Sequence, residues 1–197
     1  MKYIICGCVA FLLFILHDLI NDAGGYKKSR ELFFIGCGLL TAASVGLTVS
    51  AIAERLPLAR VAVVFSIVAA LFLVLLIYTL FFALPFHKTY IGDGPEDASE
   101  DMSNKVCDTG VYALCRHPGV LWLIGFYLFL SLAFPERDLI IGSVLFSLLD
   151  ITYVILQDLY IFPHAFSDYD TYRKSTPFLV PTAGSVKRCF LADGRRS

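Results

Sequence analysis

The chain has 197 residues, of which 57% are hydrophobic and only 17% are charged. A soluble domain of this length cannot bury that much apolar surface in one core, so the composition excludes an ordinary soluble protein and predicts an integral membrane protein. The formal net charge of −1 argues against a nucleic-acid partner, because no surplus of positive charge is available to neutralise phosphates.

Five apolar segments follow one another along the chain and predict an all-α, polytopic membrane helix bundle with about five transmembrane helices. They comprise residues 3–20, 32–53, 61–86, 119–134 and 139–162. The second and third contain no charged side chain and are 22 and 26 residues long, enough to cross about 30 Å of hydrocarbon at 1.5 Å per residue. The fourth is short, and we expect it to take its first turn from Pro118. No small-x-small cleavage site follows the first, so we expect it to remain in the protein.

Polar residues close two of these segments. His17 and Asp18 end the first, and His87 ends the third. Neither place has metal-ligand spacing such as HExxH, so we predict solvated side chains at the membrane interface and no metal site. The six cysteines form no CxxC pair, which favours small, reduced, apolar side chains over a disulfide framework or a zinc site.

The positive charges predict how the helices are oriented. If the carboxyl terminus is cytoplasmic, twelve of the 16 lysines and arginines lie on the cytoplasmic side. The positive-inside rule describes this asymmetry, so we place the amino terminus outside and the carboxyl terminus in the cytoplasm. The chain then divides into residues 1–86, a three-helix membrane segment, and residues 87–197, a catalytic-type region with two membrane helices and a polar tail. The sequence leaves the oligomeric state open.

The connection before the fourth segment contains two polar features. Residues 92–104 carry five acids and no base, which predicts a solvated loop, with a lid over a neighbouring site as the alternative. The stretch GVYALCRHPGVLW, residues 110–122, then places Arg116 and His117 at the membrane boundary. A basic residue there is typical of a cytoplasmic flank. The alternative interpretation is that both side chains bind a ligand.

The fifth segment contains two carboxylates, Asp150 and Asp158, which are costly at membrane depth and by default face a protein interior. Together with Tyr153 and Gln157 they fall at positions i, i+3, i+7 and i+8, which is one stripe of a helix. For Asp158, near the cytoplasmic end, we predict a functional role. For Asp150 a buried hydrogen bond between helices and a functional role remain open.

Two stretches of this chain resemble the isoprenylcysteine carboxyl methyltransferase family and its bacterial, phospholipid methyltransferase-like relatives. TGVYALCRHP, residues 109–118, resembles the signature in which G-x-Y precedes R-H-P at the start of a membrane helix. QDLYIFPHAFSDYDTYRKSTPFLVP, residues 157–181, is similar to the carboxyl-terminal pattern of two acids, Y-x-x-Y and a proline-ended apolar stretch. The resemblance covers roughly residues 105–185.

The resemblance implies an enzyme that takes S-adenosylmethionine as methyl donor beneath a cytoplasmic cofactor-binding cap. It also implies a lipophilic acceptor, a small molecule or membrane lipid with a carboxylate, amine or thiol, that enters from the bilayer. By family position, Arg116 and His117 are the catalytic candidates and would contact the cofactor or an acceptor carboxylate. The implied cofactor-binding residues are Gly110, Tyr112, His117, Pro118, Gln157, Asp158, Tyr169 and Tyr172. Among these, Asp158 suits the ammonium of the donor, and the tyrosine faces suit its sulfonium.

Three positions depart from the family pattern, and they keep two alternatives open. Gln157 replaces the first acid, while Val120 and Trp122 replace a tyrosine and a glycine. Membrane steroid and sterol reductases also resemble the R-H-P and Y-x-x-Y pieces but use NADPH; they usually carry an asparagine where this chain has Gly119. The second alternative is a catalytically silent membrane protein on the same scaffold.

Overall fold

A computed structural model describes residues 1–24, 26–53, 60–83 and 105–191. Helices account for 84% of these residues and no strand occurs among them, which confirms the all-α prediction. All six cysteines are free thiols, as the sequence predicted. His87 and the acidic segment 92–104 lie outside the described residues.

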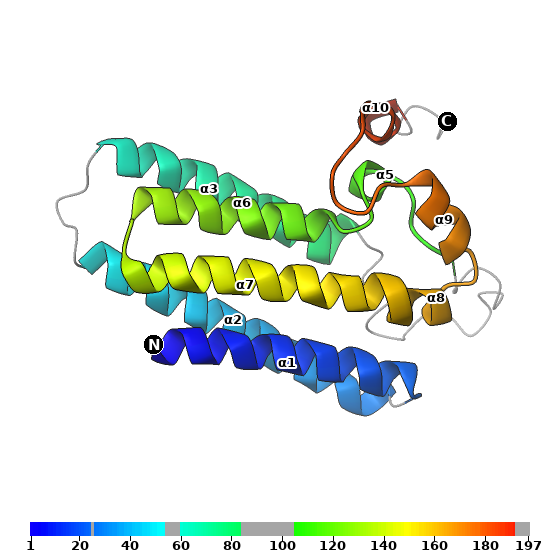
Figure 1. The fold of residues 1–197 in the computed structure, drawn as a ribbon, viewed down its shortest axis with the longest axis horizontal. Coiled ribbons are helices and arrows are strands. Elements are labelled where there is room, and N and C mark those ends of the chain that lie inside the picture. The colour runs from blue at the N-terminus through cyan, green and yellow to red at the C-terminus, as the bar shows by residue number, and fades with distance from the viewer. Residues whose placement is uncertain (25, 54–59, 84–104, 192–197) are drawn as a thin grey trace.

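The long helices of the described residues lie side by side along the longest axis of the molecule (Figure 1). They are α1 (Lys2–Asp22), α2 (Tyr26–Ala53), α3 (Arg60–Tyr78), α6 (Pro118–Ala133) and α7 (Arg137–Leu156). Helix α1 packs between α2 and α7, and α6 packs between α7 and α3. The last two of these helices therefore pack against the first three, because α7 lies against α1 and α6 lies against α3.

The remaining elements gather at one end of the bundle, which we call the cap end. Helix α3 continues into a π-helical turn, η1 (Thr79–Ala83), and α7 continues into a second one, η3 (Gln157–Ile161). Figure 1 shows short helices at the same end. They are α5 (Val111–Leu114), α8 (Phe162–Ala165), α9 (Tyr169–Ser175) and α10 (Ala183–Leu191).

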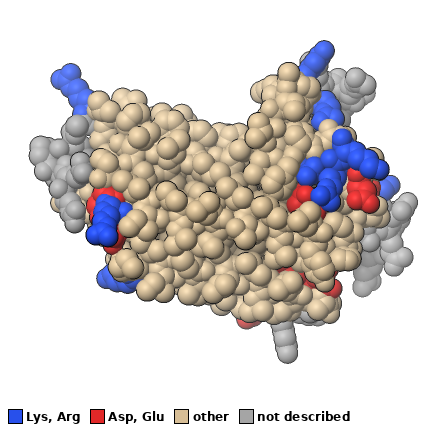
Figure 2. All heavy atoms as spheres, viewed as in Figure 1, with Lys and Arg blue, Asp and Glu red and all other residues tan. Residues whose placement is uncertain are grey.

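Among the described residues, four helical stretches are long and apolar enough to cross a membrane: Lys2–Asp22, Arg30–Ala53, Arg60–Ala83 and Arg137–Ala165. The fourth predicted segment is different, because α6 has only 16 residues and spans about 24 Å. It begins at Pro118, and Pro135 follows its last turn, so neither end can be extended in helical geometry. Figure 2 shows charged side chains towards the two ends of the molecule and a wide uncharged belt between them, as expected of a membrane protein.

Helices α1 and α7 approach closely where α1 has a glycine. A Cβ atom on Gly7 would lie 2.1 Å from the tip of the Phe146 ring, so only the missing side chain allows this contact. Phe146 is fully buried and has Phe11 and Tyr127 as ring neighbours, so its ring has no room to move aside. Small residues serve this purpose at many helix interfaces in membranes.

We expect Gly7→Ala to destabilise the bundle by about 1–3 kcal/mol, because the new methyl group overpacks the contact with Phe146. Thermal unfolding in detergent measures the loss. Gly38→Ala on α2 is the matched control, since no atom lies within 4 Å of the added Cβ and the residue is exposed. Equal midpoints for the two variants would contradict the close approach of α1 and α7.

Candidate functional site

The backbone joins the two stretches that the resemblance had singled out. Between α5 and α6 the chain is extended at Cys115, with φ −158° and ψ 165°. The next two amides point outward: Arg116 N donates to the Pro177 carbonyl at 2.9 Å, and His117 N donates to the Phe178 carbonyl at 3.3 Å. The R-H-P segment is thereby held against a stretch about sixty residues later in the chain.

A buried ion pair between Arg116 and Asp158 is the centre of the site. Arg116 Nε donates to Asp158 Oδ1 at 2.7 Å and Nη2 donates to Oδ2 at 3.0 Å, which is the two-pronged geometry of the strongest such pairs. Arg116 Nη1 donates to the carbonyls of Arg173 and Thr176. The two side chains are only 8% and 5% exposed, so Arg116 is not a solvated flank of a membrane helix.

Three further side chains surround the same carboxylate. Tyr169 donates its hydroxyl to Asp158 Oδ1 at 2.6 Å, and His117 Nε2 lies 3.3 Å from that oxygen. Arg173 Nε lies 3.7 Å from Oδ2 and its side chain is 42% exposed, so it forms the outer edge of the group. We call these five residues, Arg116, His117, Asp158, Tyr169 and Arg173, the Asp158 cluster. Its members come from α9, η3 and the loop before α6.

The Asp158 cluster carries a surplus of positive charge. Burial lowers the pKa of His117 below its ordinary value, although its hydrogen bond to Asp158 acts the other way, so this imidazole is neutral at pH 7. Burial and the adjacent carboxylate raise the pKa of Tyr169, which stays a neutral donor. Two guanidinium groups therefore face a single carboxylate, and an anionic group is the ligand that this arrangement favours.

The lowered pKa of His117 predicts a pH-dependent stability. Because the unfolded chain binds a proton at about 6.5 and the folded protein only at lower pH, the free energy of unfolding should fall as the pH drops below 6.5. The loss should be complete once the pH is below the folded-state pKa. Thermal unfolding of the wild type and His117→Asn, from neutral pH down to about pH 5, measures it. His117→Asn should not show this loss of stability at low pH, whereas His164→Asn, with a 58% exposed side chain, should still show it. If the unfolding midpoint fell with pH in the same way in all three proteins, the loss could not be assigned to His117.

The other predicted residues of the R-H-P stretch position the loop. Tyr172 donates its hydroxyl to the Tyr112 carbonyl at 2.7 Å, and the Tyr112 hydroxyl donates to the Thr79 carbonyl in η1 at 3.1 Å. Gly110 precedes α5 with φ +59°, a conformation that favours glycine. Pro118 is buried as the first residue of α6. Tyr172 is almost fully buried, so of these tyrosines Tyr112 is the more accessible.

Gln157 does not join the Asp158 cluster, although it precedes Asp158 in the chain. Its Nε2 donates to Asp18 Oδ2 and to the Tyr153 hydroxyl, both at 2.8 Å. The prediction of solvated interfacial side chains at the end of the first segment is wrong, because His17 and Asp18 are 5% and 8% exposed. The His17 ring lies against Phe33 on α2, and Asp18 accepts from Gln157 in η3. Periodicity within one helix could not indicate which neighbours α1 would meet.

Asp150 and Cys115 do not belong to the Asp158 cluster. Asp150, two helical turns before Asp158, makes no hydrogen bond or ion pair within the described ranges. Burial raises the pKa of the Cys115 thiol to about 11, so it is protonated and is not a nucleophile. Across the described residues no group of three or more histidine, cysteine or acidic side chains could hold a metal ion.

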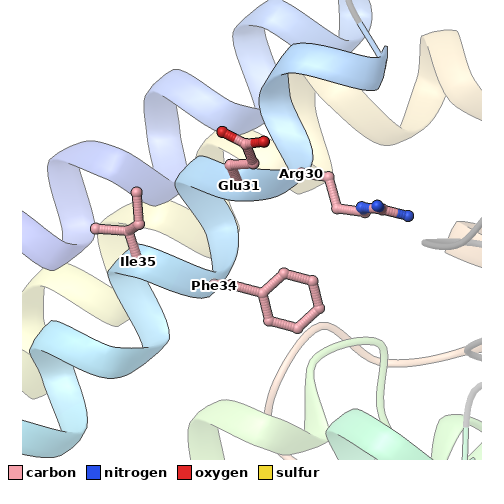
Figure 3. A pocket seen from close by; sticks show the side chains of 4 residues that line it. All are labelled: Arg30, Glu31, Phe34 and Ile35. Carbon is pink, nitrogen blue, oxygen red and sulfur yellow. The ribbon is translucent and has the colours of Figure 1, made fainter.

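A hollow of about 590 Å³ lies beside α2 near the cap end. Figure 3 shows the side chains of Arg30 and Phe34 extending from α2, with Glu31 and Ile35 on the same two turns of the helix. Phe34 and Ile35 are about half exposed. None of these lining residues belongs to the Asp158 cluster.

Sequence reasoning missed three residues that complete the site. Arg173 is the half-exposed cation of the cluster, and Phe162 and Phe178 enclose the His117 ring at centroid distances of 5.8 and 5.2 Å. All three lie inside residues 157–181, the stretch that resembled the family pattern. Their types, one basic and two aromatic, were visible, but nothing in their spacing indicated which buried group they would meet.

Comparisons of the chain with protein-family models, with curated proteins and with solved structures found no match. The residues and the geometry of the Asp158 cluster therefore carry the functional inference.

Proposed function

We propose that the protein is an integral-membrane methyltransferase that transfers the methyl group of S-adenosylmethionine to a lipophilic acceptor. The observation that carries the proposal is the Asp158 cluster. It joins Arg116 and His117 of the R-H-P stretch to Asp158 and Tyr169 of the carboxyl-terminal stretch, at one end of a bundle of apolar helices. These are the two pieces on which the family resemblance rests.

The charges of the cluster suit the carboxylate of the donor or of the acceptor. Arg173 is the reachable cation, since its side chain is 42% exposed while that of Arg116 is 8% exposed. A guanidinium pairs with two carboxylate oxygens at once, which fixes direction as well as position. In this arrangement Asp158 holds Arg116, and it can meet the donor's ammonium only by giving up one of its present partners.

Methyl transfer requires little more of the protein than alignment. When bound, S-adenosylmethionine supplies an electrophilic methyl group, and the acceptor atom must lie in line with the bond that breaks. The cluster offers no strong base, because His117 is neutral but buried against Asp158 and Tyr169 stays protonated. This chemistry favours an acceptor that is already a nucleophile at neutral pH, such as a carboxylate.

A second candidate, a non-catalytic membrane protein on the same helices, is favoured by one observation. Both oxygens of Asp158 already accept hydrogen bonds from the chain itself, so the cluster also has a complete structural role. The reductase alternative has no observation of its own in the described residues and is retained only as an outcome of the test.

Direct ligand binding separates these functions. Calorimetry on detergent-purified protein would test S-adenosylmethionine, S-adenosylhomocysteine and NADPH. Saturable binding of the first two, lost in Asp158→Ala, is the expected result, with Asp170→Ala on the exposed face of α9 as the control that retains binding. Binding of NADPH alone would move the protein to the reductases. Binding of none by folded protein would leave the non-catalytic role.

A further inference from the structure

A second buried polar group lies one residue along the chain from Asp158, at the contact between α1 and η3. Asp18, 8% exposed, accepts a hydrogen bond from Gln157 at 2.8 Å. The Tyr153 hydroxyl accepts from the same amide and is itself hydrogen-bonded to Asp18. Three side chains from two helices thus close a triangle of hydrogen bonds in which each has a partner.

The position of this triangle allows it to orient a residue of the Asp158 cluster. Gln157 is the first residue of the π-helical turn η3 and Asp158 is the second. A π-turn departs from regular helix geometry and occurs frequently at functional sites. Consecutive residues on any helical turn point in different directions, about 100° apart in a regular α-helix. Holding Gln157 against α1 therefore sets the rotation of the turn, and with it the direction in which Asp158 meets Arg116.

We propose that Asp18 is a positioning residue for the Asp158 cluster and acts through Gln157. Asp18 holds the Gln157 amide against α1, Gln157 holds the start of η3, and Asp158 is then directed to the guanidinium of Arg116. The inference rests on the proposed function in so far as the cluster is the site to which we assign the methyl donor. It also explains what Gln157 does in this chain, since an amide, unlike a carboxylate, donates to Asp18.

Hydrogen exchange of the Arg116 and His117 amides tests the proposal without any ligand. These amides donate to the carbonyls of residues 177 and 178, and the two hydrogen bonds hold the R-H-P segment in place. In Asp18→Leu, Gln157 loses its acceptor on α1, so we expect exchange at these two amides to rise at least tenfold. In Asp18→Asn the amide oxygen still accepts from Gln157, so exchange should stay near the wild-type rate.

A second variant makes the route through Gln157 testable. Gln157→Leu should raise exchange at the same amides, and the double variant with Asp18→Leu should raise it no further than either single change. Asp22→Asn, one turn beyond Asp18 and 4.0 Å from His164, is the control that should leave exchange unchanged. Exchange that rises only in α1 and α7, that rises equally in Asp18→Asn, or that adds up in the double variant would overturn the proposal.

Binding of S-adenosylmethionine is measured separately from hydrogen exchange. If wild-type protein binds no S-adenosylmethionine but exchange follows the expected pattern, the proposed function fails and the positioning role stands. If wild-type protein binds S-adenosylmethionine, Asp18→Leu should weaken binding at least tenfold and Asp18→Asn by no more than about twofold. Unchanged binding in Asp18→Leu would overturn the role of Asp18 while leaving the proposed function in place.

Discussion

Arg116→Ala is expected to destabilise the protein by about 3–5 kcal/mol and to abolish binding of S-adenosylmethionine. The change leaves the buried carboxylate of Asp158 without its two-pronged partner, and an uncompensated charge in such surroundings is very costly. It also releases the carbonyls of Arg173 and Thr176, which Arg116 now holds. Thermal unfolding in detergent and calorimetry with the donor measure the two effects.

Two comparisons make this prediction specific. Arg137→Ala removes an exposed arginine at the start of α7, far from the cluster, and should change neither stability nor binding. Arg116→Lys keeps the charge but cannot donate to both oxygens in the same geometry, so it should recover only part of the loss. If Arg116→Ala unfolded at the wild-type midpoint, the buried ion pair could not be the centre of the site.

Tyr169→Phe is expected to cost about 1.5–3 kcal/mol, the range for a hydrogen bond to a charged group. The variant keeps the ring, which is buried beside Phe162 and Tyr172, and removes only the hydroxyl that donates to Asp158 at 2.6 Å. The remaining donors, Arg116 and His117, still satisfy the carboxylate, so the loss should be smaller than that of Arg116→Ala.

The matched control is Tyr160→Phe. Tyr160 lies in η3, the π-turn that carries Asp158, but it is 46% exposed, and no hydrogen bond of its hydroxyl occurs in the described part of the chain. We expect its unfolding midpoint to equal that of the wild type. A loss in Tyr160→Phe as large as that in Tyr169→Phe would mean that tyrosine hydroxyls act here in some general way and not through Asp158.

Much of the fold could be predicted from local sequence. Apolar length and the absence of charge predicted α3 and the apolar part of α2, which begins earlier, at Tyr26. A helix in hydrocarbon must satisfy its own backbone and must carry apolar side chains. The same criteria marked the fourth segment as short, and α6 indeed has only 16 residues between Pro118 and Pro135. Chain direction could be followed as well, because alternating helices bring the R-H-P loop and the carboxyl-terminal stretch to the same end.

Side-chain partners were much harder to predict. The spacing of Asp150, Tyr153, Gln157 and Asp158 predicted one stripe of a helix, yet the members of this stripe have different partners. Gln157 and Tyr153 face Asp18 on α1, while Asp158 faces Arg116. The π-turn η3 interrupts the regular spacing of 3.6 residues per turn at this point. Nothing in the sequence of the segment predicts a π-turn.

Hydrophobic length and residue type are local properties, and they were sufficient to predict the membrane class, the helical architecture and the two stretches from which the site is built. The folded protein was needed to show that Arg116 is buried and paired with Asp158, that Arg173 is the accessible cation of the cluster, and that Asp18 lies beside Gln157. These outcomes depend on which helices pack together and at what rotation. That is settled by the fit of whole surfaces, such as Gly7 against Phe146, which no single segment contains.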